Sequence, residues 1–264
     1  MKKPEQWIVA TDLDATLLDH DTYSWEAARN TLQMLKEAGI PVVLASSKTA
    51  AEMRTLREEM KNEDAFLAEN GGFAALPNGD EIILGQSRIE ILDAIDGCRP
   101  AVMTSRGFSQ MTTEEISRLT GLTMENASQA ADRQTSEPIY WQDSETVWTE
   151  FSEALHSRGL RTAIGGRFRH VMGETSKARA IKTIADWYEK QLGRDIRVLA
   201  LGDSENDAEM LSEADCAIWI RKRGATPSID LKSGGRCSVE FGPQGWADCV
   251  MAFFASLGIL RAVR

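Results

Sequence analysis

Short apolar runs alternate with segments of helical periodicity at both ends of this 264-residue chain. The runs cover residues 7–10, 40–45, 66–68, 197–201 and 216–220. Helical patterns lie at about 24–38, after 49, at about 177–191 and near 247–257. Strands that alternate with helices are joined by crossover connections, so this pattern predicts an α/β fold with a parallel sheet.

The middle of the chain breaks this alternation. A hairpin pattern over 73–84 turns at 77–80. Beyond it we expect helices at 89–95 and 114–119, the second behind a Thr112/Glu115 capping box, and strands near 139–141 and 160–164. We therefore predict that 86–174 form a smaller inserted α+β module, and that 1–85 and 175–264 form the sheet domain.

The charge balance limits the partners of this chain. Its formal charge of -10 opposes any broad nucleic-acid surface. A phosphorylated small molecule remains compatible, because a bound metal and local cations can reverse the sign inside a site. The four cysteines form no CxxC pair, which favours a reducing, cytoplasmic location. The apolar runs are too short for a membrane span, and the oligomeric state is left open.

Two carboxylates follow the first apolar run. Asp12 and Asp14 are two residues apart, so on an extended chain their side chains leave on the same side. One interpretation is an Asp-rich turn. The other is an aspartyl nucleophile beside a second acid, with a hard cation such as Mg²⁺ between the repelling charges.

Polar side chains at three further strand ends or helix starts favour the second interpretation. Ser46 follows the second run, Lys177 begins a helix, and a cluster containing Asp203 and Asp207 follows 197–201. Together with Asp12 they suit phosphoryl transfer through an aspartyl phosphate. A carboxylate that approaches a phosphate is repelled by about 4 kcal/mol per unit charge at 4 Å and an effective dielectric of 20, so neutralising groups are required.

We predict a role for each of these groups. Asp12, Asp203 and the backbone carbonyl of Asp14 would hold Mg²⁺, while Lys177 and the Ser46 hydroxyl would donate to the phosphoryl oxygens. Asp14 would protonate the leaving alcohol and then deprotonate the attacking water.

The remaining polar residues of the second cluster support this site. Asn206 and Asp207 would orient Lys177 and the metal ligands.

These motifs resemble, in the same order, those of the haloacid dehalogenase-like phosphohydrolases: DxDxT at 12–16, Ser46, Lys177 and GDxxxD at 202–207. The resemblance implies a doubly wound core, an inserted cap that closes over the site, and a phosphate-binding role for Thr16. The family usually has glycine where this chain has Ala15. Alanine disfavours positive φ, so we expect ordinary dihedral angles there and an altered rate of reaction.

Segments 45–53, 68–71, 133–141 and 165–168 are similar to the mannosyl-3-phosphoglycerate phosphatases, in which SSKT, SEP and GGRF recur. This likeness implies hydrolysis of 2-O-mannosyl-3-phosphoglycerate to mannosylglycerate and phosphate. Alternatives are a phosphatase or phosphomutase acting on sugar phosphates or glucosyl-3-phosphoglycerate, and a non-catalytic binding protein that retains the fold.

For each of three residues we consider a role at the substrate and a simpler structural role. Arg167 is a turn residue or, given the resemblance, a bidentate partner of the substrate carboxylate. Lys48 either lies at a solvated helix start or has a direct role at the site. Asn70 belongs to a strand-exit turn or binds sugar hydroxyls. The three histidines, among them His170, are expected at the surface.

Overall fold

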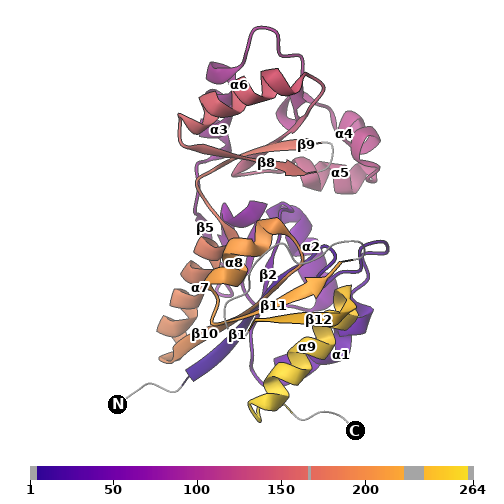
Figure 1. Ribbon diagram of the computed structural model, residues 1–264, viewed down its shortest axis with the longest axis vertical. Helices are drawn as coiled ribbons and strands as arrows, with labels where there is room; N and C mark the ends of the chain where they lie inside the picture. The colour runs from indigo at the N-terminus through magenta and orange to yellow at the C-terminus, as the bar shows by residue number, and fades with distance from the viewer. Residues whose placement is uncertain (1–4, 166–167, 223–234, 261–264) are drawn as a thin grey trace.

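The computed structural model describes residues 5–165, 168–222 and 235–260. Its larger sheet has eight strands in the order β12-β11-β10-β1-β2-β3-β4-β5 (Figure 1). Their bounds are β1 (Glu5–Asp12), β2 (Val42–Ala45), β3 (Phe66–Ala68), β4 (Phe73–Ala75), β5 (Glu81–Ile83), β10 (Asp195–Gly202), β11 (Cys216–Arg221) and β12 (Arg236–Phe241). The pairs from β12 to β3 are parallel, and β4 and β5 join antiparallel. The predicted α/β class is confirmed.

Helices cover both faces of this sheet. The helices on one face are α1 (Arg29–Glu37), α2 (Ala50–Met60) and α9 (Gly242–Ser256), and those on the other are α7 (Lys177–Leu192) and α8 (Ala208–Glu213). Side chains alternate along β1, so Val9 packs into the first layer while Ile8 and Ala10 pack into the second. The core is therefore doubly wound, as the family resemblance implied.

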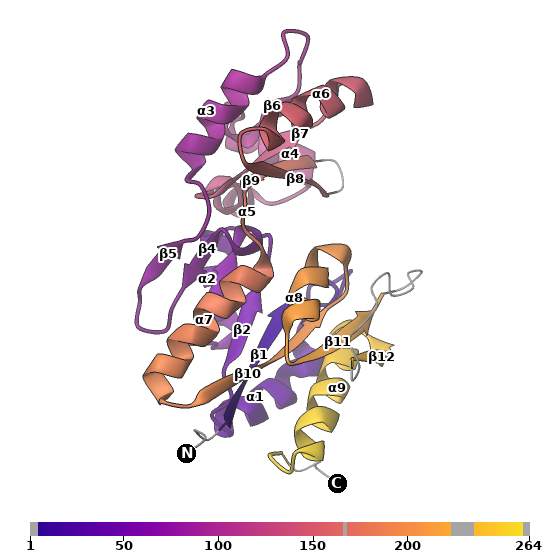
Figure 2. The ribbon, with the colours of Figure 1, turned by 60° about the vertical axis from the view of Figure 1, so that its left-hand side comes forward.

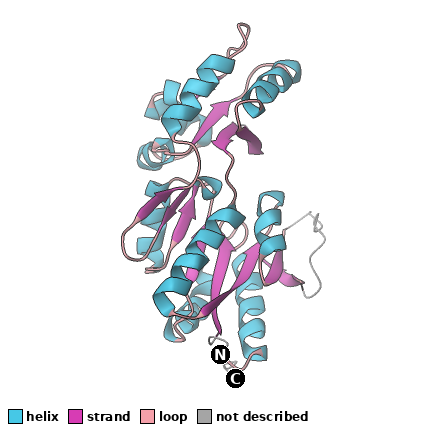
Figure 3. Ribbon diagram, turned by 90° about the vertical axis from the view of Figure 1, so that its left-hand side faces the viewer, coloured by secondary structure: helices cyan, strands magenta, loops and turns pink. Residues whose placement is uncertain are grey.

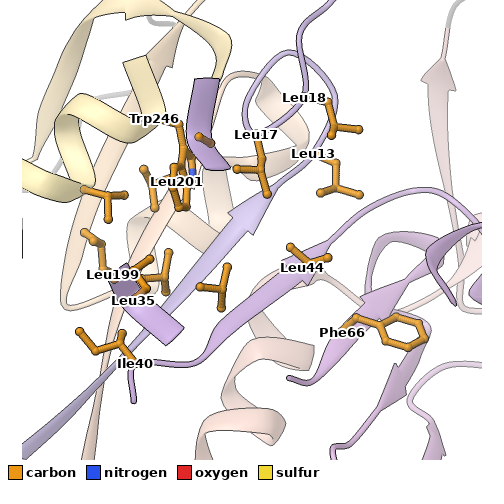
Figure 4. Packing of buried hydrophobic residues seen from close by; sticks show 14 of the residues in the cluster. Leu13, Leu17, Leu18, Leu35, Ile40, Leu44, Phe66, Leu199, Leu201 and Trp246 are labelled. Carbon is orange, nitrogen blue, oxygen red and sulfur yellow. The ribbon is translucent and has the colours of Figure 1, made fainter. Parts of the chain in front are cut away.

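The first apolar layer anchors the segment that follows β1. Leu13, Leu17 and Leu18 are buried with Trp246 of α9 (Figure 4). Each leucine contributes roughly 1.5–3 kcal/mol by leaving water. This packing holds the backbone immediately after Asp12 in one place.

Local sequence signals account for several helix ends. The Thr49 hydroxyl accepts from the Glu52 amide, and the Glu52 carboxylate accepts from the Thr49 amide, which completes the capping box of α2. Thr112 caps α4 in the same way, as predicted. The helix expected from about residue 24 instead begins with a 3₁₀ turn at Glu26–Ala28.

A separate antiparallel sheet belongs to the middle of the chain, in the order β6-β7-β9-β8 (Figure 3). Its strands are β6 (Arg106–Gly107), β7 (Ser136–Tyr140), β8 (Leu160–Gly165) and β9 (Phe168–Gly173), with helices α3 (Arg88–Cys98), α4 (Thr113–Thr120), α5 (Met124–Ala131) and α6 (Glu145–His156). This cap module sits over the carboxyl ends of β1, β2 and β10 (Figure 2).

Two neighbouring connections join the cap module to the larger sheet. The first runs through Gly85 and Gln86, and the second through Gly173 and Thr175. A side chain on Gly173 would meet the Gln86 backbone nitrogen at 2.7 Å, so this close approach requires glycine. Within the described residues, no helix combines the length and apolarity needed to cross a bilayer.

Candidate active site

The predicted strand-end groups converge at one edge of the larger sheet. Asp12 ends β1, Ser46 follows β2, Asp203 follows β10, and Lys177 is the first residue of α7. All four side chains are buried. Parallel strands present their carboxyl ends at the same edge, which explains why distant residues meet there.

Lys177 lies between two carboxylates. Its Nζ is 2.6 Å from Asp12 Oδ1 and 2.6 Å from Asp207 Oδ1. Burial by itself lowers the pKa of Lys177, but these carboxylates outweigh burial and raise it. Burial and the Asp207 charge raise the pKa of Asp12 to about 7, although Lys177 acts in the opposite direction. The single ammonium group of Lys177 therefore leaves the pair of Asp12 and Asp207 with excess negative charge.

These two carboxylates and that of Asp203 could together hold a divalent cation. Ligand oxygens of Asp12, Asp203 and Asp207 lie within 4.8 Å of one another. Asp207 Oδ1 accepts from Lys177, and Asp207 Oδ2 accepts from the backbone amides of Asp203 and Ser204, each at 3.2 Å. Asp12 and Asp203 are thus the better placed direct ligands, and an all-oxygen donor set suits Mg²⁺.

Lys222 was not anticipated from the sequence. Its Nζ is 3.1 Å from Asp203 Oδ2. Burial raises the pKa of Asp203, and Lys222 opposes that change. Lys222 directly follows β11, so its position beyond a parallel strand was the signal that could have identified it.

Asp14 and Lys48 form a second pair beside the first. Lys48 Nζ is 2.8 Å from Asp14 Oδ1 and 2.7 Å from Asp14 Oδ2. Of the two hypotheses for Lys48, this geometry favours direct involvement over a solvated helix start. Burial lowers the pKa of Lys48, but Asp14 and Glu52 outweigh it and raise the pKa.

The backbone between Asp14 and Thr16 differs from expectation. Ala15 has φ 64°, so the prediction of ordinary dihedral angles was wrong. The turn is held by backbone bonds from Thr16 and Leu18 to the Leu13 carbonyl, at 3.1 and 2.8 Å. These contacts and the buried leucines impose a left-handed conformation that costs alanine roughly 1–2 kcal/mol.

Thr16 and Asn206 both form hydrogen bonds with residues of the second acidic cluster. The buried Thr16 hydroxyl donates to Asp203 Oδ1 at 3.2 Å, which favours orienting that carboxylate over touching a phosphate. Asn206 is exposed and accepts from the Ser204 hydroxyl at 2.5 Å.

Asn70 lies behind Ser46 in a strained turn. The backbone amide of Asn70 donates to the Ser46 carbonyl at 3.0 Å, and φ is positive at Glu69, Asn70 and Gly71. Asn70 Oδ1 is buried without a hydrogen-bond donor among the described residues. This orphaned oxygen is compatible with the sugar-binding hypothesis. Arg167 lies outside the described residues.

The cap module contacts the Ser46 loop directly. Thr49 Oγ1 donates to the Gln129 carbonyl of α5 at 2.8 Å. Glu69 of the larger sheet accepts from the amides of Gln134 and Thr135 at 2.8 and 3.0 Å. Sequence analysis missed Glu69 because its partners lie more than sixty residues away in the other module.

Comparisons with known proteins agree with this geometry. The chain belongs to the haloacid dehalogenase-like hydrolase family, whose model matches residues 9–96 and 141–223. Solved structures share the fold: a Thermoplasma acidophilum protein has a TM-score of 0.69 at 17% identity, covering 97% of this chain and 100% of that one. A phosphatase of the haloalkanoate superfamily from Bacteroides thetaiotaomicron has a TM-score of 0.68 at 17% identity, covering 97% and 96%.

The chain is also similar over most of its length to two curated phosphatases. A glucosyl-3-phosphoglycerate/mannosyl-3-phosphoglycerate phosphatase from Methanococcoides burtonii is 33% identical over 262 residues, which span 92% of this chain and 96% of the relative. A protein of the same name from Persephonella marina is 35% identical over 260 residues, spanning 92% and 95%. The resemblance seen in the sequence is confirmed.

Proposed function

We propose that this protein is a Mg²⁺-dependent phosphatase that hydrolyses a glycosyl-3-phosphoglycerate through an aspartyl phosphate, with mannosyl-3-phosphoglycerate as the first candidate. The observation that carries the proposal is the position of Asp12, held by Lys177 and adjacent to Asp203 in a buried carboxylate cluster. The names of the two curated relatives support the substrate class.

The residues divide the reaction between them. Lys177 donates to Asp12 Oδ1 and offsets the negative charge of this carboxylate, so Asp12 can attack phosphorus with one oxygen while the other remains available to the metal. Asp14 gives its proton to the departing alcohol and afterwards takes one from the water that cleaves the aspartyl phosphate. Both oxygens of Asp14 contact Lys48, so one of these contacts opens when Asp14 carries the proton.

Asp12 and Asp203 would hold the metal, together with the Asp14 backbone carbonyl, and the metal would supply positive charge that offsets the charge of the phosphoryl oxygens. Lys177 and the Ser46 hydroxyl would donate to the same phosphoryl group. Thr16 would maintain the direction of the Asp203 carboxylate.

The two modules suit a division of labour. We propose that 1–85 and 175–264 form the catalytic core and that 86–174 form a cap that selects the substrate. The separate sheets and the paired connections near Gly85 and Thr175 support these boundaries. The free thiols of all four cysteines support the cytoplasmic location that we propose.

Phosphate release tests this function. Mannosyl- and glucosyl-3-phosphoglycerate, hexose phosphates and sucrose phosphate are assayed with and without Mg²⁺. We expect the glycosylglycerates to exceed the free sugar phosphates by about 100-fold in kcat/KM, because unpaired polar contacts cost several kcal/mol. Asp12→Asn should lose at least about 10³-fold in kcat, whereas the exposed Asp93→Asn should behave as wild type.

Other outcomes identify the alternatives. A phosphomutase would return an isomerised phosphate ester and little free phosphate. A flat substrate profile would indicate a generic phosphatase. Equal rates for wild type and Asp12→Asn would leave a non-catalytic binding protein.

A further inference from the structure

Arg133 lies at the junction of the two modules, two residues after the end of α5. Its Nη1 is 2.9 Å from Ser136 Oγ and 3.4 Å from the Ser47 carbonyl, and its Nε donates to the Ala130 carbonyl at 3.1 Å. Ser47 is the residue between Ser46 and Lys48. The guanidinium therefore rests on the loop that supplies the Ser46 hydroxyl and the cation bound to Asp14.

The ammonium groups around this site already have carboxylate partners. Lys177 has Asp12 and Asp207, Lys48 has Asp14, and Lys222 has Asp203.

Arg133 differs from these cations. In the part of the chain that the structure describes, no carboxylate oxygen lies within 4.0 Å of its guanidinium, and its three partners are neutral oxygens. Burial lowers the pKa of Arg133, although Glu69 and Glu52 act in the opposite direction. Arg133 is half-buried, and a cation that has lost part of its hydration without gaining an anion is costly, so an arriving anion would relieve that cost.

The Glu69 carboxylate near Arg133 is occupied by other donors. Glu69 accepts from two backbone amides and from Ser136 Oγ at 2.5 Å. Ser136 thus joins Glu69 to Arg133 through a hydroxyl, which fixes the guanidinium without pairing it directly. Nε and Nη1 already donate to neutral oxygens, so among the described residues Nη2 is the nitrogen left to donate to an arriving anion, from a guanidinium that the other contacts hold in place.

A histidine beside Arg133 adds no second positive charge there. Burial and the Arg133 charge lower the pKa of His170, on β9, to about 3. At neutral pH the imidazole is therefore uncharged, and the positive charge at this position is that of Arg133. This corrects the expectation of a surface histidine.

We propose that Arg133 binds the carboxylate of the glycerate and selects substrates that carry this second anion, an inference that rests on the proposed function. The phosphoryl group is already provided for by Asp12, Ser46 and Lys177. In a 3-phosphoglycerate the carboxylate lies a few bonds from the ester oxygen. Ser46 and Ser47 are adjacent, with Cα atoms about 3.8 Å apart, so one small molecule can span both contacts.

The test compares two substrates that differ in this group alone. One is mannosyl-3-phosphoglycerate, and the other is the same molecule with its carboxylate reduced to an alcohol. We expect Arg133→Gln to lower the kcat/KM ratio of acid to alcohol by about 100-fold, mainly through KM. Arg133→Lys should lie between that variant and wild type, because a lysine keeps the charge but cannot make the several contacts that hold the guanidinium in place.

Arg118→Gln, on the exposed side of α4, is the matched control and should keep the wild-type ratio. Melting temperatures verify folding, and Arg133→Lys preserves the test if Arg133→Gln does not fold. An unchanged ratio in folded Arg133 variants overturns this inference and leaves the phosphatase proposal standing. A wild-type protein that hydrolyses neither molecule overturns both.

Discussion

Replacing Lys177 by methionine should destabilise the protein strongly. The side chain is 2% exposed, and its ammonium is 2.6 Å from each of two buried carboxylates. Loss of one partner from a buried ion pair costs about 3–5 kcal/mol, because it leaves an uncompensated charge. Folded domains have only about 5–15 kcal/mol of total stability, so this is a large share.

The loss of stability in Lys177→Met should depend on pH, and the pKa of Asp12 determines the direction of that dependence. The pKa of Asp12 is about 7 in the folded protein, above its ordinary value of 3.8, and it rises further without Lys177. A carboxyl group whose pKa is raised by folding destabilises the fold increasingly as pH rises above the unfolded value. The deficit of Lys177→Met should therefore be larger at pH 8 than at pH 5.5, where protonation removes the excess charge.

Urea unfolding in EDTA at the two pH values measures this deficit. Lys182→Met, an exposed position on the same helix, is the control. Adding Asp207→Asn to Lys177→Met should restore part of the stability, because it removes one of the stranded charges. A deficit below about 1 kcal/mol, or one that is equal at both pH values, would refute the reasoning.

Substitutions at two further positions probe backbone strain and acid sensitivity. Ala15→Gly should stabilise by up to about 1 kcal/mol, since relief of positive φ outweighs the entropy of glycine. Ala15→Val should destabilise, and melting temperatures that move in the opposite order would contradict this account. Between pH 7.5 and 5.5 the contribution of His170 to the free energy of unfolding should fall by about 1 kcal/mol, because the unfolded chain takes up a proton that the folded protein excludes, while the raised pKa of Asp12 acts in the opposite direction. Relative to wild type, His170→Gln should therefore gain about 1 kcal/mol over this range in urea titrations, whereas the exposed His20→Gln should follow the wild type; a His170→Gln protein that also follows the wild type would contradict the assignment.

The sequence predicted best where chemistry coincides with regular structure. Asp12, Ser46 and Asp203 were identifiable because each follows a short apolar strand, and parallel strands bring such ends together. The start of α7 at Lys177 was also predicted correctly.

Other elements carried weaker signals. β12 is mostly exposed, so its sequence has no apolar run to detect. α9 begins at Gly242, five residues before the predicted start, and Pro243 in its first turn was the available signal. α6 was missed although Ser144 caps it and Trp148 and Phe151 share its buried face.

The contacts across the modules could not be read from the chain alone. Glu69 and Arg133 acquire their partners only when the cap docks on the larger sheet. The strained Ala15 shows the same limit, because buried leucines and backbone hydrogen bonds override the local preference of alanine.

The nearness of Gln86 and Gly173 has a mechanical consequence. Because the two connections lie against each other, they can act together as one hinge, about which the cap module would rotate rather than slide. Any opening of the cap module would therefore move Arg133 away from Ser47 along an arc. Entry of the substrate and release of its carboxylate would then be parts of the same rotation.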